Sequence, residues 1–346
     1  MLARWKEYFQ NLLSVLTTPE RLQQTSERTD NHDETAPPTF NEICTIINKL
    51  KANKVAGTDN ITGELIKHGG RTLKQKIHKL ICNIWNTETL PAQWNDGIIC
   101  STYKDDDRLD CNNYRPIMLL NVAYKIYAIL LNKRLSEIIE NKLGDFQMGF
   151  RPNRSTIDNI FRVRQIFEKC YEYNIELHNI FVDYSQAFDS VNRNKIIECL
   201  TKYKVPKKLI LIGLTFINPT AKVKIGNQLT NEFRIVSGIK QGDPLSATLF
   251  SIVIDNVLKQ LDLKGNISTR IKQCSAYADD ILITTRTMHC LVDTFQRLKK
   301  ISVQVGLNII EHKMKYLRCT KKQHKMDGID NIQTHLEQVK SFKYLG

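Results

Sequence analysis

The chain has 346 residues, of which 42% are hydrophobic and 25% are charged, so it can bury a substantial core and has an ordinary globular composition. Lysine and arginine number 50 against 36 aspartate and glutamate residues, which gives a formal net charge of +14. This excess is typical of proteins that bind a polyanion, usually nucleic acid, but a merely soluble surface explains it equally well.

Nine cysteines are scattered without any C-x-x-C pair, a pattern that argues against a zinc site and against a disulfide framework. No secretory leader is predicted, because Arg4, Lys6 and Glu7 stand where its apolar core should begin. The longest apolar stretch, residues 209–217, is too short to span a bilayer. We therefore expect an intracellular protein, in the nucleus or cytoplasm, that is not secreted and has no membrane partner.

Apolar residues at helical spacing predict an amphipathic helix over residues 1–22, and a linker without large apolar residues follows at 23–39. The next elements predicted in chain order are helices at 40–50, 62–68 and 72–88, a short strand at 97–103 and a polar loop at 104–113.

Beyond this loop, helices alternate with separated short strands, which indicates an α+β fold. The predicted helices are 117–139, 157–172, 193–204, 208–217, 245–261 and 288–304. The predicted strands are an apolar run at 179–183, a pair at 221–225 and 231–236, and a hairpin at 272–285.

Two adjacent aspartates, Asp279 and Asp280, stand at the tip of the predicted 272–285 hairpin. Neighbouring strand residues point to opposite faces, but both carboxylates can converge at a turn. Such a pair is costly to ionise unless a cation neutralises it. The triplet at 105–107 has no strand around it and is interpreted as a solvated turn, whereas apolar strands flank the pair at 279–280.

A third carboxylate, Asp183, ends the apolar run at 179–183. Three carboxylates from two strands suit Mg²⁺, a hard cation that prefers oxygen ligands. Two such ions about 3.5–4 Å apart activate an attacking hydroxyl and stabilise a leaving oxygen, which is the chemistry of phosphoryl transfer to a 3′-hydroxyl. Asp189, near a predicted helix start, is interpreted as a cap or turn residue and not as a ligand.

Between the two acidic segments, Gly242 and Pro244 predict a tight loop that opens a buried helix. Glycine lets the backbone approach a ligand closely. Alone, the loop is an ordinary helix-initiating turn; between two acidic strands, it is suited to lining a nucleotide pocket.

These segments, in this order, resemble the palm motifs of reverse transcriptases, most closely those of non-LTR (LINE-type) retrotransposons. The palm motifs are F-V-D-Y-S-Q-A-F-D at 181–189, S-G-I-K-Q-G-D-P-L-S at 237–246 and Y-A-D-D at 277–280. The resemblance extends to N-N-Y-R-P-I-M-L-L-N at 112–121, F-Q-M-G-F-R-P-N-R-S-T at 146–156, G-L-N-I-I-E-H-K at 306–313 and F-K-Y-L-G at 342–346. Y-A-D-D alone would be a weak signal, but this collinear set is specific and spans most of the chain.

The resemblance implies an α+β fold with the fingers and palm of a right-hand polymerase, in which an antiparallel palm sheet packs on helices. It places a reverse transcriptase domain at 96–346, ending in the primer-grip motif, after a helical extension at 1–95. Proteins of this type usually carry an endonuclease before this region and a thumb after it. We therefore expect the thumb to be missing and the chain to be truncated.

The resemblance further implies an RNA-directed DNA polymerase that extends a DNA primer on an RNA template with deoxynucleoside triphosphates. Its cofactors would be two Mg²⁺ ions, with Mn²⁺ as an alternative. Asp183 and Asp279 would bind both metals, Asp280 would support the site, and the backbone carbonyl of Tyr184 would complete one metal shell.

Other matching positions acquire roles in the same way. Lys104 and Arg115 would contact the incoming triphosphate. Phe188 would lie beneath the sugar and exclude a 2′-hydroxyl, Gln241 would line the pocket of the nascent base pair, and Lys313 would donate a proton to the leaving pyrophosphate.

Template and primer contacts would come from basic and aromatic residues at three further positions, namely Arg151, Arg154 and Tyr344. Simpler interpretations stand beside these roles. Lys104 and Arg115 could be surface cations, Phe188 could belong to the core, and Lys313 could be one solvated charge of a basic stretch.

Two other functions stay open at the level of sequence. One is a catalytically inactive remnant that binds nucleic acid without turnover. The other is an RNA-templated RNA polymerase, whose palm chemistry is the same and against which Phe188 argues. The motifs predict no oligomeric state.

Overall fold

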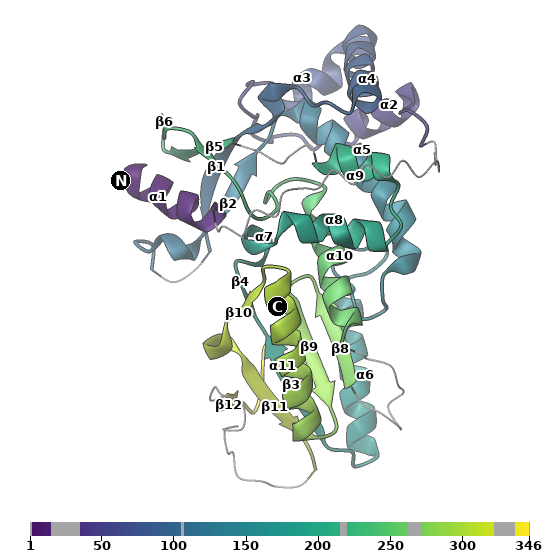
Figure 1. Ribbon diagram of the computed structural model, residues 1–346, viewed down its shortest axis with the longest axis vertical. Coiled ribbons are helices and arrows are strands. Elements are labelled where there is room, and N and C mark those ends of the chain that lie inside the picture. Colours follow the sequence, from purple (N-terminus) through teal and green to yellow (C-terminus); the bar gives the residue numbers. More distant parts are fainter. Residues whose placement is uncertain are drawn as a thin grey trace. The chain divides into compact units, whose positions relative to one another are not determined.

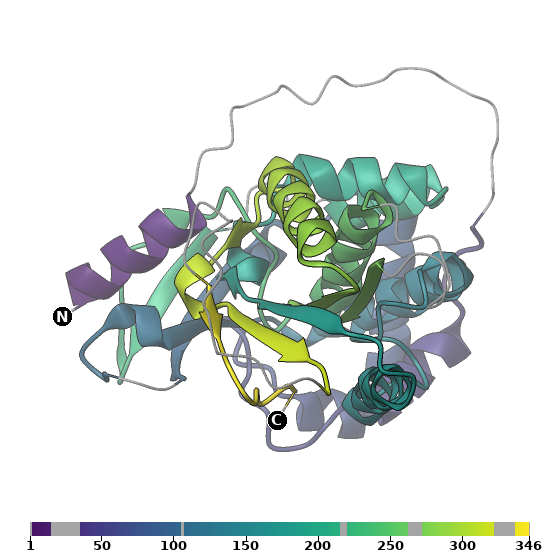
Figure 2. The same cartoon turned by 90° about the horizontal axis from the view of Figure 1, so that it is seen from below.

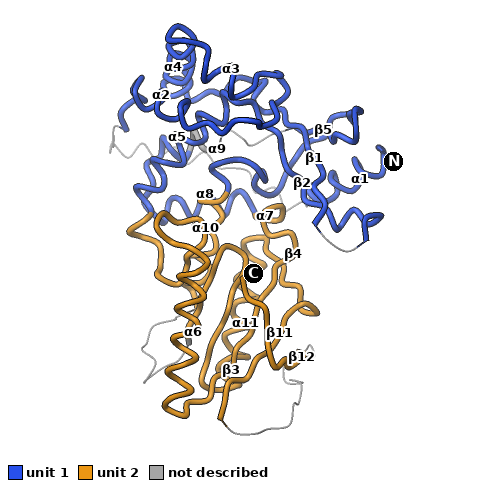
Figure 3. Tube along the Cα trace, turned by 180° about the vertical axis from the view of Figure 1, so that it is seen from behind, with its two compact units in different colours: residues 1–139, 192–246 blue, residues 140–191, 247–346 orange. Residues whose placement is uncertain are grey.

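The computed structural model describes residues 2–14, 35–104, 107–214, 220–261, 272–321 and 336–345 (Figure 1). The chain divides into two compact units, unit 1 with residues 1–139 and 192–246, and unit 2 with residues 140–191 and 247–346 (Figure 3). Both units combine helices with sheets, so the predicted α+β class is confirmed. The predicted domain boundary near residue 95 stays a prediction.

Parts of several predictions lie outside the described residues. They are the end of the predicted first helix, most of the predicted linker at 23–39, the first two aspartates of the 105–107 triplet and the end of the predicted helix at 208–217.

Unit 1 is built on a mixed sheet of order β2–β1–β5–β6, in which β7 also pairs with β5. Its strands are β1 (Asp96–Tyr103), β2 (Tyr114–Leu119), β5 (Thr220–Ile225), β6 (Gln228–Leu229) and β7 (Phe233–Arg234). Strands β1 and β2 form an antiparallel hairpin, whereas β1 and β5 run parallel. The parallel pair joins the two chain segments of unit 1, residues 1–139 and 192–246, in one sheet.

In unit 1, one helix, α1 (Leu2–Leu13), packs on strand β5 of this sheet, and the other helices pack on one another. These others are α2 (Phe40–Asn48), α3 (Gly63–His68), α4 (Gly70–Thr87), α5 (Val122–Ile139), α8 (Arg193–Lys202) and α9 (Lys207–Leu214), with short 3-10 turns η1 (Ala92–Trp94) and η2 (Cys111–Asn113). Helix α2 begins at a capping box in which Thr39 and Glu42 exchange hydrogen bonds. The predicted helix at 117–139 was wrong at its start, because residues 117–119 pair with β1.

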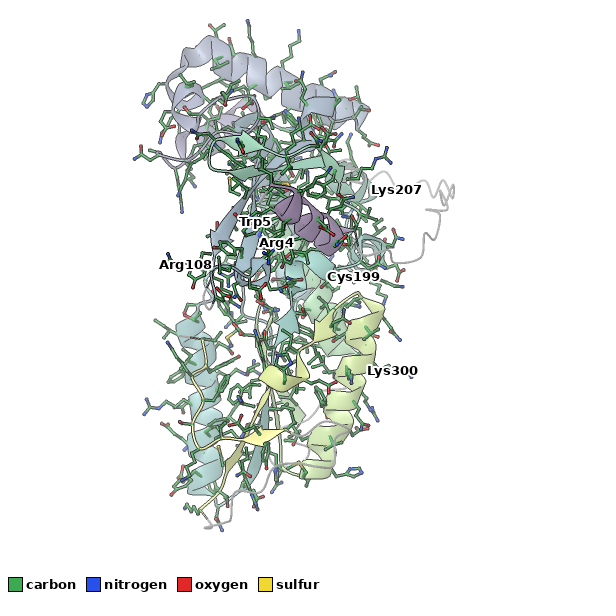
Figure 4. All side chains as sticks on the ribbon, turned by 90° about the vertical axis from the view of Figure 1, so that its left-hand side faces the viewer. Arg4, Trp5, Arg108, Cys199, Lys207 and Lys300 are labelled. Carbon is green, nitrogen blue, oxygen red and sulfur yellow. The ribbon has the colours of Figure 1, made fainter. Side chains whose placement is uncertain are left out.

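Helix α1 is anchored to the β1–β2 hairpin of unit 1 (Figure 4). The Trp5 ring meets Tyr114 edge-on, with 4.8 Å between ring centroids, and stacks on Phe9, which is fully buried. The Arg4 guanidinium donates a hydrogen bond to the carbonyl of Leu109 at 3.3 Å. The amphipathic spacing of the sequence therefore corresponds to a helix whose apolar side faces the sheet.

Unit 2 is built on a sheet of order β12–β11–β3–β9–β8, and its central strands all pair antiparallel, as predicted for the palm. The strands are β3 (Leu177–Val182), β8 (Lys272–Tyr277), β9 (Asp280–Thr285), β11 (Lys315–Cys319) and β12 (Glu337–Gln338). A separate two-stranded sheet joins β4 (Tyr184–Ser185) to β10 (Asn308–Ile309).

Helices cover both faces of the unit 2 sheet, with α11 and α6 on opposite sides (Figure 2). The helical elements are α6 (Thr156–Glu172), α7 (Ala187–Ser190), α10 (Ser246–Lys259) and α11 (Met288–Gln304), with short turns η3 (Glu140–Lys142) and η4 (Glu311–Lys313). Phe181 and Leu282 pack on Val163 of α6, while α11 contacts β3, β8 and β9. Because β3 is covered on both faces, all six of its residues are buried, including the polar His178 and Asn179 as well as the apolar residues at 180–182.

All nine cysteines are free thiols. Among the helices that the structure describes, none is both long and apolar enough to cross a membrane.

Candidate active site

The acidic residues come from β3 and the β8–β9 hairpin, which are neighbours in the unit 2 sheet. Val182 pairs with Ile281, so continuing the antiparallel register by one residue sets Asp183 opposite Asp280. Cβ atoms of directly opposite residues lie about 4.5–5.5 Å apart, and their side chains share one face of the sheet. The register therefore brings these two predicted positions together.

Asp279 lies in the two-residue turn between β8 and β9, since Tyr277 pairs with Asp280. The first turn residue, Ala278, has a φ of 58°, a conformation that is uncommon for a residue with a Cβ atom. A turn this tight keeps both aspartates at the end of the hairpin. Asp183 and Asp279 are half-buried and Asp280 is exposed, so all three positions have access to solvent.

Whether the three aspartates fit a metal ion is judged from their donor atoms and from the strand register. Within the described ranges, no three Asp, Glu, His or Cys side chains form a cluster that could hold a metal ion. However, Mg²⁺ at phosphoryl-transfer sites is usually bound by one or two carboxylates, substrate phosphates and water, without an all-protein cage. Adjacent, partly exposed carboxylates on two strands fit a site of that kind.

Tyr184 follows Asp183 directly and is held in the small β4–β10 sheet. It pairs with Ile309, and the N–H of Ile310 donates to the carbonyl of Asp183 at 2.9 Å. The buried Tyr184 hydroxyl lies 2.8 Å from the Ser302 hydroxyl, and burial raises the pKa of Tyr184. The backbone at Asp183 is thus fixed on both sides, while metal coordination by the Tyr184 carbonyl stays a prediction.

Lys313 is exposed at the end of η4, which joins β10 to β11. Strand β11 pairs Lys315 with Phe181, so η4 lies at the end of β3 at which Asp183 stands. Its predicted role with pyrophosphate stays a prediction.

Phe188 belongs to α7, a one-turn helix just after β4. Its half-buried ring stacks on Phe250 of α10, with 4.4 Å between centroids and 19° between planes, and meets Phe150 edge-on at 6.2 Å. Asp189, which the sequence suggested as a cap or turn residue, lies inside this short helix and is buried; Gln186, with a φ of 44°, precedes the helix.

Unit 1 brings the two predicted phosphate-binding cations onto the β1–β2 hairpin. Arg115 faces Thr102, and the N–H of Lys104 donates to the carbonyl of Asn113 at 2.8 Å, which extends the ladder beyond β1. Lys104 and Arg115 are therefore diagonal neighbours on one face, about 7–8 Å apart, and both are exposed. Two adjacent cations of this kind can bind phosphate oxygens.

Gln241 lies in the loop between β7 and α10 and is tied to strand β2. The N–H of Met118 donates to the Gln241 carbonyl at 2.8 Å. Gly242 has a φ of 103°, and a Cβ atom there would lie 2.9 Å from the carbonyl oxygen of Met118. Only glycine permits this approach, which holds the loop against the strand that carries Arg115.

A buried polar network supports the same loop. The Tyr124 hydroxyl donates a hydrogen bond to Asp243, and burial raises the pKa of both groups. Lys240 lies 5.7 Å from the Tyr124 ring centroid, and burial lowers the pKa of Lys240 to about 8. Arg193 donates to the Gly238 carbonyl at 2.8 Å, and burial lowers the pKa of Arg193 to about 10. None of these four residues was singled out from the sequence.

Two of the predicted nucleic-acid contacts have different surroundings. Arg151 is engaged within unit 2: its guanidinium bonds the Glu140 carboxylate at 2.9 Å and the carbonyls of Glu140, Gly144 and Gln147. Arg154 is exposed just before α6. The contacts of Arg151 make it a structural residue of the loop before α6, and nucleic-acid contact by either arginine stays a prediction.

Tyr344, from the predicted primer-grip motif, packs on the palm sheet. Its ring centroid lies 5.5 Å from that of Phe181, and its hydroxyl accepts from Asn159 at 3.1 Å and donates to the Ser275 carbonyl at 3.4 Å. Burial raises the pKa of Tyr344, and the negative charge of Asp280 adds to the increase. The motif therefore lies near the acidic end of the sheet, and its contact with a primer stays a prediction.

Arg151→Met is expected to lower the free energy of unfolding by about 2–3 kcal/mol, because it leaves a carboxylate and several carbonyls without their donor. Urea denaturation followed by circular dichroism measures this loss. Arg154→Met, three residues away and exposed, is the matched control and should change stability by less than about 0.5 kcal/mol. Equal losses in the two variants would contradict the structural role of Arg151.

Solved structures share this fold. Apo telomerase from Candida tropicalis has a TM-score of 0.53 at 12% identity, over 76% of this chain and 52% of that chain. The same enzyme truncated from its C-terminal domain has a TM-score of 0.51 at 14% identity, over 76% and 57% of the two chains. The predicted fingers and palm of a right-hand polymerase are confirmed as the fold.

The family described as reverse transcriptase (RNA-dependent DNA polymerase) matches residues 102–346, and this chain belongs to it. The uncharacterised 149 kDa protein of transposon TX1 from Xenopus laevis is 26% identical over 82% of this chain. The Pol polyprotein of retrotransposable element R2 from Popillia japonica is 26% identical over 74%, and the RNA-directed DNA polymerase from mobile element jockey of Drosophila funebris is 24% identical over 90%. The predicted relationship to non-LTR retrotransposon reverse transcriptases is confirmed.

The chain spans only part of these relatives. It covers 23% of the TX1 protein, 38% of the R2 polyprotein and 35% of the jockey polymerase.

Proposed function

We propose that this chain provides the fingers and palm of an RNA-directed DNA polymerase, which adds deoxynucleotides to the 3′-hydroxyl of a DNA primer on an RNA template. The observation that carries the proposal is the strand register that sets Asp183 beside the Asp279–Asp280 turn, in a chain of the reverse transcriptase family. The partly exposed carboxylates at this end of the sheet support a site for phosphoryl transfer.

In this proposal, Asp183 and Asp279 hold two Mg²⁺ or Mn²⁺ ions, Asp280 supports them, and the Tyr184 carbonyl completes one shell. When bound, the ions neutralise phosphate charge and make the primer hydroxyl a better nucleophile. The anchoring of the Asp183 backbone by Ile310 keeps the carboxylate at a constant position. A rigid acidic site of this kind acts by positioning and electrostatic stabilisation.

Five further residues are proposed to act on the incoming nucleotide. Lys104 and Arg115 hold the triphosphate through their exposed cationic groups, and Gln241 lines the pocket of the nascent base pair. The Lys313 ammonium donates a proton to the leaving pyrophosphate. The ring of Phe188, held in place by Phe250, occupies the space of a 2′-hydroxyl and so favours deoxynucleotides.

Primer extension on an RNA template with deoxynucleoside triphosphates tests this proposal. We expect incorporation that requires Mg²⁺ or Mn²⁺ and stops when the metal is chelated. Nucleic-acid binding measured in parallel at increasing salt separates the alternative. Binding with a steep salt dependence but no incorporation would indicate a protein that holds nucleic acid without turnover.

A further inference from the structure

The segment F-Q-M-G-F at residues 146–150 lies beside β8, the strand that leads into the aspartate turn. The N–H of Met148 donates to the carbonyl of Ala276 at 2.9 Å, and the N–H of Ala276 donates to the carbonyl of Phe146 at 2.8 Å. Gln147 and Ala276 form a parallel bridge between these bonds. The segment therefore extends the palm sheet next to the catalytic hairpin.

Gln147 connects this segment to the turn itself. Its side chain is fully buried, and its Oε1 atom accepts the N–H of Gly149 at 2.9 Å and the N–H of Ala278 at 3.3 Å. Ala278 is the turn residue with positive φ, directly before Asp279. Two donors fix the orientation of the carboxamide, because a flipped amide would set donor against donor.

The amide nitrogen of the same carboxamide is buried. Among the residues that the structure describes, the Nε2 atom of Gln147 has no hydrogen-bond partner. Within this described part of the chain, the hydrogen bonds of the side chain therefore go to its own segment and to the Ala278 turn.

Gly149 makes the close approach possible. A Cβ atom on Gly149 would lie 2.3 Å from the backbone nitrogen of Ala278, so only glycine fits at this position. The Ser251 hydroxyl donates to the Gly149 carbonyl at 3.2 Å, and Arg151 donates to the Gln147 carbonyl at 3.0 Å. The backbone of the 146–150 segment, which bears the Gln147 side chain, is thus itself held in place.

We propose that Gln147 is a positioning residue that holds the Ala278–Asp279 turn in the conformation that presents the aspartates to metal ions. This inference rests on the proposed polymerase function. Without the Gln147 acceptor, the N–H of Ala278 loses its side-chain partner, and a residue strained at positive φ relaxes toward ordinary backbone conformations. Asp279 then leaves its place in the turn next to Asp280, the residue that the register sets opposite Asp183, and metal affinity falls.

The test compares two buried carboxamides of the same sheet. Gln147→Leu removes the acceptor at the turn. Asn179→Leu is the matched control. Asn179 is also fully buried, donates to the Leu317 carbonyl at 3.1 Å and accepts from Thr284 at 2.8 Å, and these partners lie on β11 and β9, away from the 278–279 turn. Thermal unfolding at increasing MgCl₂ and MnCl₂ reports metal binding, and primer extension at increasing MgCl₂ reports the requirement for activity.

We expect Gln147→Leu to raise the metal concentration at half-saturation about tenfold or more in both measurements, while duplex binding in chelator stays unchanged. Asn179→Leu should lower the unfolding temperature to a similar extent and leave half-saturation unchanged. Gln147→Glu, which keeps an acceptor, should restore part of the affinity. Equal half-saturation in the wild type and Gln147→Leu, with normal primer extension, overturns the inference and leaves the polymerase function intact.

The two proposals can fail separately. If the wild type incorporates no nucleotide, the polymerase function fails, and the metal-dependent shift in unfolding temperature still decides the role of Gln147. The positioning role is supported if metal shifts the unfolding temperature of the wild type and of Asn179→Leu but does not shift that of Gln147→Leu. A wild type without any metal-dependent shift overturns it.

Discussion

Replacing Asp183 or Asp279 by asparagine is expected to reduce the rate of single-nucleotide incorporation at least about a thousandfold, or roughly 4 kcal/mol in activation free energy. Asparagine keeps the shape of the side chain but removes the charge that would bind the metal ions and balance the phosphates. The rate is measured at saturating nucleotide and at several Mg²⁺ concentrations. Excess metal should restore little activity, because neither amide replaces a carboxylate as ligand.

The protein should stay folded in both variants. Like charges directly opposite on neighbouring strands are destabilising, so Asp183→Asn in chelator should raise the free energy of unfolding by about 0.2–1 kcal/mol through its neighbour Asp280. Asp293→Asn on α11 is the control, because Asp293 pairs with Arg297 at 3.2 Å on an exposed helix face. It should change neither stability nor incorporation appreciably. Full activity of Asp183→Asn or Asp279→Asn would rule out the metal role.

The acidic strand and hairpin were predictable because local pattern and structure coincide there. The second half of strand β3, residues 180–182, is an apolar run directly before Asp183, and the 272–285 hairpin has strand-forming residues on both sides of a tight turn. The turn conformation follows less directly, since Ala278 adopts a positive φ without being glycine. The hydrogen bond that the N–H of Ala278 donates to Gln147 and the close approach of Gly149, both far away in the chain, accompany that conformation.

Pairings between distant segments were not predictable. The parallel contact of β1 with β5 and the two-residue strands β4 and β10 depend on tertiary packing that no local period records. Strand β11 lies in a basic stretch that reads as solvated, yet Tyr316 within it is buried and its hydroxyl lies 2.7 Å from Nδ1 of His178. The alternation of polar and apolar residues in β11 spans too few residues to indicate a strand.

Buried polar groups were the other gap. No local pattern in the sequence indicates that Tyr124, Asp243 and Gln147 are buried, because the hydrogen-bonded partners Tyr124 and Asp243 are 119 residues apart in the chain, and Gln147 and Ala278 are 131 residues apart. Motif resemblance located Arg151 but could not show that its guanidinium bonds carbonyls of its own loop. Sequence thus suggests which residues to consider for a site, while the structure shows which partners their side chains already bond.

Phe188→Val is expected to raise ribonucleotide incorporation relative to deoxynucleotide incorporation by about a hundredfold, the scale on which a pocket discriminates one hydroxyl. In the wild type, the Phe188 ring stacks on Phe250 at 4.4 Å between centroids, and in the proposed site a ring held in this plane would exclude a 2′-hydroxyl by its bulk. Valine opens that space. Incorporation of each nucleotide type on the same RNA template, compared as kcat/KM, measures the change.

Two further variants separate sugar exclusion from simple loss of packing. Phe250→Leu removes the support but keeps the Phe188 ring, and it should shift the ratio in the same direction by a smaller factor because the ring is no longer held in one plane. Phe161→Val alters a ring that is 62% exposed on α6 of the same unit and should leave the ratio unchanged. An unchanged ratio in Phe188→Val would assign this ring to the core alone. A wild type that prefers ribonucleotides would instead indicate an RNA polymerase, because the intact Phe188 ring would then fail to exclude the hydroxyl.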